Sequence, residues 1–387
     1  PDGGAPARPV IMTTPGLKTF LLACAAMVLS LAALAQTAAG PAGASLRALQ
    51  YPADVLMDPS GQQSFAEIQR RFENGESRPV SGSSPLPLGG ERTAWLRISL
   101  PDVPAPTEAV LTVAHPGMDS VVLHQPAPGG LWKVQVSGDK LPVSQWPMPY
   151  LHPAFSLEIS AADPRPVYLA VQHSTPIGIY WQLWDRASFD RQSSTLHMVL
   201  GGYLGFVVLV VILSCFNAYN WRDPIHLVYA GYVVILGLGQ LSLTGLAGEY
   251  LWPDHARWND LAAVTVPMFS AGWAAVLVYR LVVERGHRLA SGLLLSVMLL
   301  SLAMTLGFLL LGREKLFYVS NFAYMYLTPV VLGCLVWFSF RRPLAGLWAL
   351  AGFLCLAIGS MFPILRNLNL VPVNFYTQFG AQIGAAL

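Results

Sequence analysis

The chain has 387 residues, of which 54% are hydrophobic and only 11% are charged, and its mean hydropathy is +0.49. A soluble domain carries about 25% charged residues, so this composition excludes an ordinary soluble protein and indicates one embedded in a lipid bilayer. The formal net charge of +2 is too small to indicate a nucleic-acid partner, and we expect none.

The first residues have the composition of a targeting segment. Residues 1–11 form an upstream leader rich in Pro, Gly and Ala, and residues 12–35 have the pattern of a signal peptide. Lys18 precedes a run of about fifteen apolar residues, and the small-x-small sequence at 33–35 fits a cleavage site. An uncleaved anchor is the alternative, because such a run is short for a membrane span. Either form exports the segment that follows.

The exported segment, residues 36–190, predicts an all-β domain. Short runs of alternating polarity lie between Pro- and Gly-rich turns, which is typical of an antiparallel sandwich or barrel. The predicted strands are 95–100, 109–114, 120–124, 131–136, 167–172 and 180–184. One stretch, 64–72, predicts a short helix instead, with Phe65, Ile68 and Phe72 on one face.

Aromatic side chains are frequent in this segment. Their faces stack on sugars and other planar groups, so we expect the domain to bind a small molecule, for which a carbohydrate-like solute is one candidate. Five residues are candidate ligand-binding residues: Trp95, Trp132, Trp146, Tyr150 and Trp181. For any single one of them, packing in the core of a sandwich is the competing interpretation. If replacing Trp132 or Trp146 by Ala abolishes the thermal stabilisation that a ligand gives the domain, the ligand-binding interpretation is supported.

No metal site or cofactor is expected. The histidines of the segment are scattered, and no C-x-x-C or Cys/His cluster with zinc spacing occurs. The segment also has no internal disulfide, because all four cysteines of the chain lie in apolar runs outside 36–195: Cys24, Cys215, Cys334 and Cys355. No catalytic motif is present, so the residues support no enzymatic assignment.

Residues 196–387 predict a bundle of seven transmembrane helices. The apolar runs are 196–219, 225–246, 261–283, 289–311, 316–340, 344–365 and 371–387. The first six exceed the roughly twenty residues that cross the hydrocarbon core. The seventh stops at the end of the sequence, and we expect it to be a span cut short.

The loop charges set the orientation. If the β domain is exported, the first, third and fifth loops are cytoplasmic, and they carry Arg222, Arg280, Arg285, Arg288, Arg341 and Arg342. The opposite loops carry Arg257, Arg313, Lys315 and Arg366. Six against four is a small excess, but its sign agrees with the positive-inside rule.

The acidic residues of this half distinguish functional classes. Every Asp and Glu after position 195 lies in a loop or at a helix end, whereas ion-coupled transporters and pumps place an ionisable group inside the membrane. Uncharged polar residues remain inside the spans. Among them Gln378 and Gln382, one helical turn apart, suit hydrogen bonds between helices.

The stretch YNWRDPIHLVYAGYVVILGLGQLSLTGLAGEYLWPD, residues 219–254, resembles the bacterial seven-transmembrane receptors with diverse intracellular signalling modules. The matching residues are Arg222, Asp223, Tyr229, Tyr232, Gly245, Tyr250, Leu251, Trp252 and Pro253. The preceding segment is similar to the second type of extracellular domain of that family, through AWLRISL, VYLAVQHSTPIGIYWQLW and Phe189. His226 departs from the usual Tyr.

The resemblance implies a fold and a function. It implies a periplasmic jelly-roll-like all-β sandwich followed by an all-α seven-helix bundle in the bacterial inner membrane. It further implies a homodimeric receptor that relays a ligand signal to a cytoplasmic module, a diguanylate cyclase or a histidine kinase. The candidate signal-relay residues are Arg222, Asp223, Tyr250, Trp252, Gln378 and Gln382.

Two features should connect the halves. We expect a short tether at about 188–196, and a docking surface for the sandwich formed by Glu249, Trp252 and His255.

The alternatives to a receptor are a transporter or channel subunit with a solute-binding domain, and a structural envelope protein.

Overall fold

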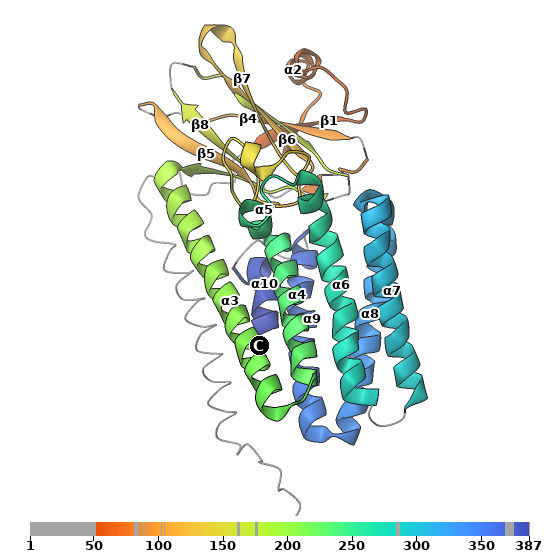
Figure 1. Cartoon of the computed structure of the whole chain (residues 1–387). Helices are drawn as coiled ribbons and strands as arrows, with labels where there is room; N and C mark the ends of the chain where they lie inside the picture. Colours follow the sequence, from red (N-terminus) through yellow and green to blue (C-terminus); the bar gives the residue numbers. More distant parts are fainter. Residues whose placement is uncertain are drawn as a thin grey trace, which may run out of the picture.

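The computed structural model describes residues 52–80, 85–86, 88–90, 92–101, 103, 105–160, 163–174, 177–283, 287–367 and 375–386. The leader predicted at 1–11 and the signal peptide predicted at 12–35 lie outside these residues. A β domain sits on one end of a bundle of long helices, as Figure 1 shows. The predicted fold class, an antiparallel β domain followed by a membrane-spanning helical bundle, is confirmed.

The β domain contains two main antiparallel sheets. The larger has the order β2 (Arg78–Val80), β1 (Ala53–Asp58), β4 (Thr93–Ile98), β9 (Val167–Gln172), β6 (Ser120–Pro126) and β7 (Trp132–Ser137). The smaller has the order β11 (Trp181–Asp185), β5 (Thr107–Val113) and β8 (Ala154–Ile159). A separate short pair joins β3 (Pro85–Leu86) to β10 (Ile177–Gly178). The six predicted strands are all present, whereas the five at β1, β2, β3, β8 and β10 were not predicted.

The core of this domain lies between the two sheets. Because side chains alternate along a strand, every second residue points inward. The larger sheet contributes Leu96, Leu123 and Leu169, and the smaller contributes Leu111 and Phe155, all with 1% exposure or less.

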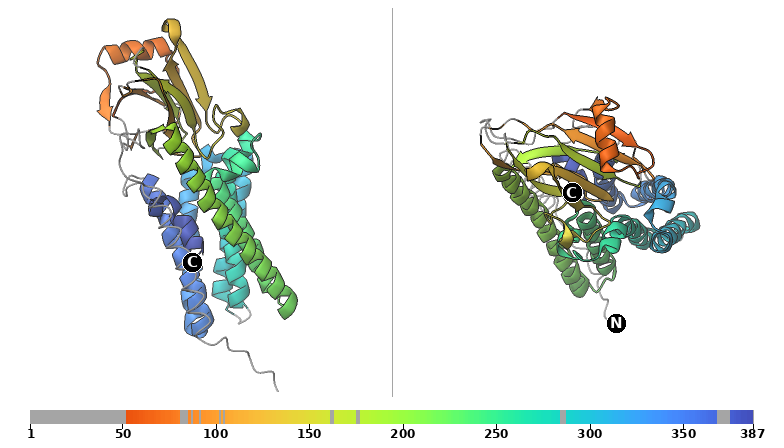
Figure 2. Two further views of the ribbon diagram at one scale, coloured as in Figure 1. Left: turned by 90° about the vertical axis from the view of Figure 1, so that its left-hand side faces the viewer. Right: turned by 90° about the horizontal axis from the view of Figure 1, so that it is seen from above.

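A short helix covers the outer face of the larger sheet. The helix α2 (Phe65–Glu73) begins with a capping box, in which Ser64 and Glu67 each satisfy a backbone N–H of the other. Ile68 and Phe72 are buried against the sheet, so the helix predicted at 64–72 is confirmed. Figure 2 shows that α2 lies at the end of the molecule away from the bundle.

The bundle consists of α3 (Arg186–Trp221), α4 (Ile225–Thr244), the short α5 (Leu246–Tyr250), α6 (Ala256–Val283), α7 (Arg288–Leu311), α8 (Arg313–Arg341), α9 (Pro343–Asn367) and α10 (Phe375–Ala386). Within the described residues, six of these helices are long and apolar enough to cross a membrane, and they coincide with the first six predicted spans. The seventh predicted span contains α10.

The predicted tether at about 188–196 is wrong. Strand β11 ends at Asp185, and α3 begins at the next residue, Arg186. The Asp185 side chain caps the helix by accepting a hydrogen bond from the Ser188 N–H at 2.8 Å. A tether was predicted there because the residues in the first turns of α3 are polar, like those of a loop. The two domains therefore share a continuous, capped backbone connection, which is stiffer than a tether.

Close backbone packing joins α9 to α10. A Cβ atom added to Gly380 would lie 2.8 Å from the Gly359 carbonyl oxygen, and one added to Gly384 would overlap the Cys355 carbonyl. Small residues allow such close approach between membrane helices. Helix α3 contains a Gly-x-x-x-Gly sequence at 201–205, a pattern that permits close helix packing, but both glycines have open space around them.

This contact predicts a difference between two glycines. Gly384→Val should destabilise the protein by about 1–3 kcal/mol, the usual cost of overpacking, because the new side chain pushes α10 away from α9. Gly352→Val, in α9 but with nothing within 4 Å of its Cβ position, should have little effect. Thermal unfolding of the full chain in detergent measures both, and equal losses of stability would contradict the contact.

Candidate functional site at the domain junction

The β domain and the bundle meet through a shared apolar core. On β5, the side chain of Val110 points away from the sandwich core, opposite to those of its neighbours. It is buried together with Tyr150 and Leu151, which lie just before β8. They pack against Phe189 of α3 and Leu246 of α5. The outer face of the smaller sheet is therefore covered by the bundle, just as α2 covers the outer face of the larger one.

A glycine allows the closest approach at this junction. Gly245 ends α4 with φ of +84°, and a Cβ atom there would overlap the Leu151 carbonyl oxygen. The loop after β7 also bonds to the bundle directly. The Ser144 hydroxyl donates to Asp254 Oδ1 at 2.6 Å, and the Ser144 N–H donates to the Pro253 carbonyl at 3.2 Å.

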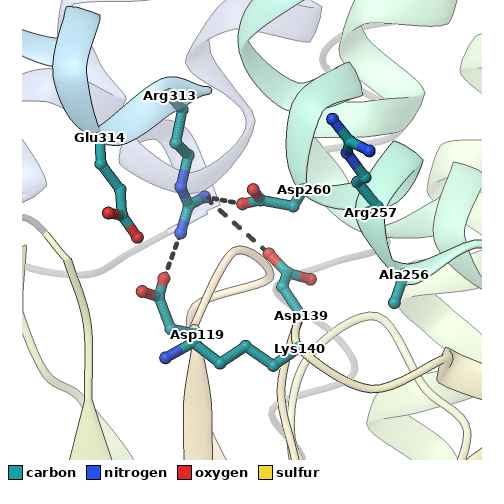
Figure 3. Close-up of a pocket in the computed structure, with 8 residues that line it drawn as sticks. All are labelled: Asp119, Asp139, Lys140, Ala256, Arg257, Asp260, Arg313 and Glu314. Carbon is teal, nitrogen blue, oxygen red and sulfur yellow. Dashed lines mark hydrogen bonds and ion pairs between the residues drawn. The ribbon is translucent and has the colours of Figure 1, made fainter. Parts of the chain in front are cut away.

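The polar centre of the junction is Arg313, at the start of α8 (Figure 3). Its Nη2 donates to a carboxylate oxygen of Asp119 and, at 3.3 Å, to the Gly117 carbonyl. Its Nη1 lies 2.8 Å from Asp260 Oδ1 and 4.0 Å from Asp139 Oδ2. One guanidinium is thus shared by three carboxylates, two from the β domain and one from α6. We call Asp119, Asp139, Asp260 and Arg313 the junction cluster.

Further polar groups hold these carboxylates in place. His173 Nδ1 lies 2.7 Å from Asp119 Oδ1, and the Ser174 N–H donates to Asp119 Oδ2 at 2.9 Å. Asn259 Nδ2 donates to Asp139 Oδ1 at 2.9 Å, and Asn259 Oδ1 accepts from Trp252 Nε1 at 3.0 Å. The network therefore connects the sandwich, Trp252 in the loop before α6, and the helices α6 and α8.

The two β-domain carboxyls of the junction cluster have opposite electrostatics. Burial opposes ionisation of Asp119, but its hydrogen bond to His173 and the charges of His173 and Arg313 outweigh that effect and lower its pKa to about 2. Burial raises the pKa of Asp139 to about 8, and Arg313 offsets only part of that rise. Since one guanidinium cannot balance three carboxylates, Asp139 holds a proton at neutral pH.

A cavity of about 230 Å³ adjoins this cluster, between the β domain and the first turns of α6 and α8. Its lining contains acids and bases in similar number (Figure 3): Asp119, Asp139, Lys140, Ala256, Arg257, Asp260, Arg313 and Glu314.

A second polar contact joins α3 to α5 below the β domain. His197 Nε2 lies 3.0 Å from Glu249 Oε2, and His197 Nδ1 lies 2.8 Å from the Ser193 carbonyl. The Tyr150 ring packs edge-on against Phe189, with centroids 5.0 Å apart. Of the residues predicted to dock the sandwich, Glu249 and Trp252 lie at the junction, whereas His255 is exposed.

The five candidate ligand residues do not form one surface. Trp95 and Trp132 belong to an aromatic cluster with α2, and Arg165 lies 5.1 Å from the Trp132 ring. Trp146 donates from Nε1 to the Gly138 and Leu141 carbonyls, which fixes the loop that carries Asp139. Tyr150 lies at the junction, and Trp181 is fully buried in the sandwich core. The structure thus gives Trp181 a packing role, and ligand binding at the others stays a prediction.

The six candidate relay residues are likewise dispersed. Arg222 and Asp223 form the α3–α4 turn at the end of the bundle away from the β domain (Figure 1). Trp252 lies in the junction network, while Tyr250 is 63% exposed beside it. Gln382 is buried in α10, and the side chain of Gln378 lies outside the described residues. Their relay role stays a prediction.

The junction cluster was not predicted from the sequence. Arg313 contributed only to the count of loop charges, and its partner Asp119 is 194 residues away. A possible signal was the presence of three acid–base pairs in loops or at helix starts: Asp139 with Lys140, Arg257 with Asp260, and Arg313 with Glu314.

Comparison with protein families matches both halves of the chain. Residues 52–185 match the family described as 7TMR-DISM extracellular 2, and residues 196–387 match the one described as 7TM diverse intracellular signalling. The chain belongs to the seven-transmembrane receptors with diverse intracellular signalling modules. It is a multi-pass membrane receptor with an extracellular sensor domain. None of the curated proteins compared with it matches. The first match ends at Asp185, the residue that caps α3.

The receptor's two glycines with φ of +84° provide a test of docking. Gly245→Ala and Gly312→Ala both cost about 1–2 kcal/mol in backbone strain, but only the first also pushes the sensor domain away at Leu151. Gly245→Ala should therefore lower the unfolding temperature more and increase hydrogen exchange around Leu151. Similar exchange in the two variants would argue against docking at this position.

The junction should also depend on pH through Asp139. Its pKa lies well above the ordinary carboxyl value when docked, so docking binds a proton and weakens as pH rises toward about 8. The slope approaches about 1.4 kcal/mol per pH unit for one proton. Asp119 has the opposite shift, but its contribution is lost only at acid pH, toward about 2.

Asp139→Asn replaces the titrating carboxyl by an amide that does not titrate. The free energy of unfolding of this variant, relative to that of the unmodified receptor, should therefore increase between pH 5 and pH 8. Unfolding temperatures of the full chain in detergent, measured across this range, test the difference. Glu108→Gln, an exposed acid in the sensor domain, is the control and should run parallel to the unmodified receptor. Parallel curves for Asp139→Asn as well would show that Asp139 is ionised throughout.

Proposed function

We propose that this receptor senses a small molecule in the periplasm and relays the signal through the seven-helix bundle to a cytoplasmic output module. The output module would be a diguanylate cyclase or a histidine kinase, as the family resemblance implies, and the receptor would act as a homodimer in the bacterial inner membrane. The observation that carries the relay is the junction cluster, in which Arg313 of α8 binds carboxylates of the sensor domain and of α6.

The cluster can couple ligand binding to the bundle for a physical reason. A ligand shifts a conformational equilibrium only if it binds the two states with different affinity. The docked and undocked states differ in whether Asp119 and Asp139 share Arg313, so a change in the sensor loops changes the charge balance at α6 and α8. The contiguous β11–α3 connection supplies a second mechanical link.

The transporter alternative has less support. Among the described spans the acidic side chains lie near helix ends: Asp190, Asp260 and Glu314. Asp260 is paired with Arg313 at the junction, rather than placed in the middle of the bundle as coupling ions require. Solute flux in proteoliposomes would favour this alternative.

The relay predicts that a change at Arg313 alters the opposite end of the bundle. Spin labels at Asn220 and Leu289, both exposed, report on the ends of α3 and α7 away from the sensor domain. In nanodiscs, and in a background without native cysteines, Arg313→Gln should shift or broaden the distance distribution between them. The reason is that three carboxylates lose their shared cation, and breaking a buried pair typically costs about 3–5 kcal/mol.

The matched control is Lys315→Gln, which removes the same charge two residues away from an exposed side chain and should leave the distribution unchanged. Identical distributions for Arg313→Gln and the unmodified receptor would reject relay through the cluster. The type of output is tested separately by reading the gene beyond the codon for Leu387. A stop codon within a few residues would reject an output module on the same chain.

A further inference from the structure

The junction cavity has an unusual distribution of charge. Each of its three walls carries both acids and bases. The sensor domain contributes Asp119, Asp139 and Lys140, the first turns of α6 contribute Arg257 and Asp260, and the first turn of α8 contributes Arg313 and Glu314. A site for a simple anion or a simple cation would concentrate one sign of charge. This cavity instead presents both signs from every side.

Some of these charges are already paired and some are available. Arg313 is surrounded by the carboxylates of Asp119, Asp139 and Asp260. The side chains of Lys140, Arg257 and Glu314 line the same cavity, are exposed, and form no ion pair within the described part of the chain. Figure 3 shows Arg257 and Glu314 on opposite sides of Arg313. The cavity therefore offers two free cationic groups and one free anionic group beside a buried cluster.

Simple ions do not match this lining. Among the described residues no group of three or more His, Cys, Asp or Glu side chains could hold a metal ion. An inorganic anion would approach Arg257 and Lys140 but would face the carboxylates of Asp119, Asp260 and Glu314. A molecule with an ammonium and a carboxylate satisfies both, because each end forms charge-assisted hydrogen bonds with groups of opposite sign.

We propose that the junction cavity binds a small zwitterion of the α-amino-acid class. Its carboxylate contacts Arg257, and its ammonium contacts the open side of Asp139. The charged ends of Lys140 and Glu314, which Figure 3 shows on the side of Arg313 away from Arg257, line the rest of the cavity. The volume of about 230 Å³ accommodates a molecule of this size. The lining of this cavity includes none of the five aromatic residues that the sequence indicated.

The buried carboxyl of Asp139 supports this assignment. Asp139 is 4% exposed, lies 4.0 Å from the nearest Arg313 nitrogen, and has its second oxygen bonded to Asn259. A carboxyl that retains a proton for lack of neighbouring positive charge is a group that an ammonium can ionise. Binding of the zwitterion then replaces that proton with a cation.

The position of the cavity gives binding a consequence. A ligand there touches the sensor loop, α6 and α8 together, so it contacts all three only in the docked state. It therefore favours docking by its differential affinity. The inference rests on the proposed function for its role in signalling, while binding itself can be measured independently.

The test uses the full chain in nanodiscs and the twenty common amino acids as probes, followed by thermal unfolding and then by titration with the best probe. At least one amino acid with an uncharged side chain should raise the unfolding temperature of the receptor. The amine and the carboxylic acid derived from that probe, each lacking one charged group, should bind at least about tenfold more weakly, a loss of about 1.4 kcal/mol. The double variant Lys140→Gln, Arg257→Gln should lose affinity by a similar factor.

The control is Lys133→Gln, Arg288→Gln, which removes the same net charge from exposed positions outside the cavity lining and should bind normally. No stabilisation by any of the twenty, or equal binding of the amine or the acid alone, would overturn the assignment, as would unchanged affinity in the Lys140, Arg257 variant. The spin-label distances separate the two proposals. If the amino acid binds but the distance distribution between labels at Asn220 and Leu289 does not change, the site is retained and the relay is rejected. If no amino acid binds, the site is rejected, and the effect of Arg313→Gln on that distribution still tests the relay.

Discussion

The architecture depends on the position of one buried guanidinium. Arg313 begins α8, yet two of the three carboxylates around it belong to the sensor domain. Docking buries Arg313, and a buried guanidinium needs partners to offset its desolvation, so the docked start of α8 requires the sensor-domain carboxylates. The converse also holds, because Asp119 is buried and its ionised form depends on the charges of His173 and Arg313.

The rest of the junction restricts how the two domains can move. The β11–α3 connection fixes one edge, since the strand continues into a capped helix. The apolar contacts of Val110, Tyr150 and Leu151 cover the middle. Arg313 lies in the polar part, where three carboxylates compete for one cation. Hydrophobic burial therefore holds one part of the junction, and a cluster with unequal positive and negative charge holds another. Such a junction can respond to a ligand or a proton, because a small change in charge alters only the polar part.

Some sequence patterns also have a structural role. Trp181 packs in the sandwich core, and Trp146 fixes a loop by donating to the Gly138 and Leu141 carbonyls, while ligand binding by the other candidates stays a prediction. The small-residue motif in α3 faces open space, while close packing occurs between α9 and α10. A motif reports which contacts a helix permits, and the partner is chosen by the fold.

The sequence by itself determined the two-part architecture, the first six spans and their orientation, because these follow from local periodicity, hydrophobic length and charge. Its resemblance to known receptors, carried by residues 219–254 and by stretches of the β domain, indicated the family. The sequence also predicted α2 and six strands but missed five. Of these, β2, β3 and β10 have too few residues to show alternation, whereas β1 and β8 are as long as the strands that were predicted. Only the tertiary structure decided the candidate site. Asp119, Asp139, Asp260 and Arg313 lie on four separate segments, up to 194 residues apart. Whether a charged residue at the end of a span faces water or a buried partner depends on which loops fold against it, and no local pattern encodes that.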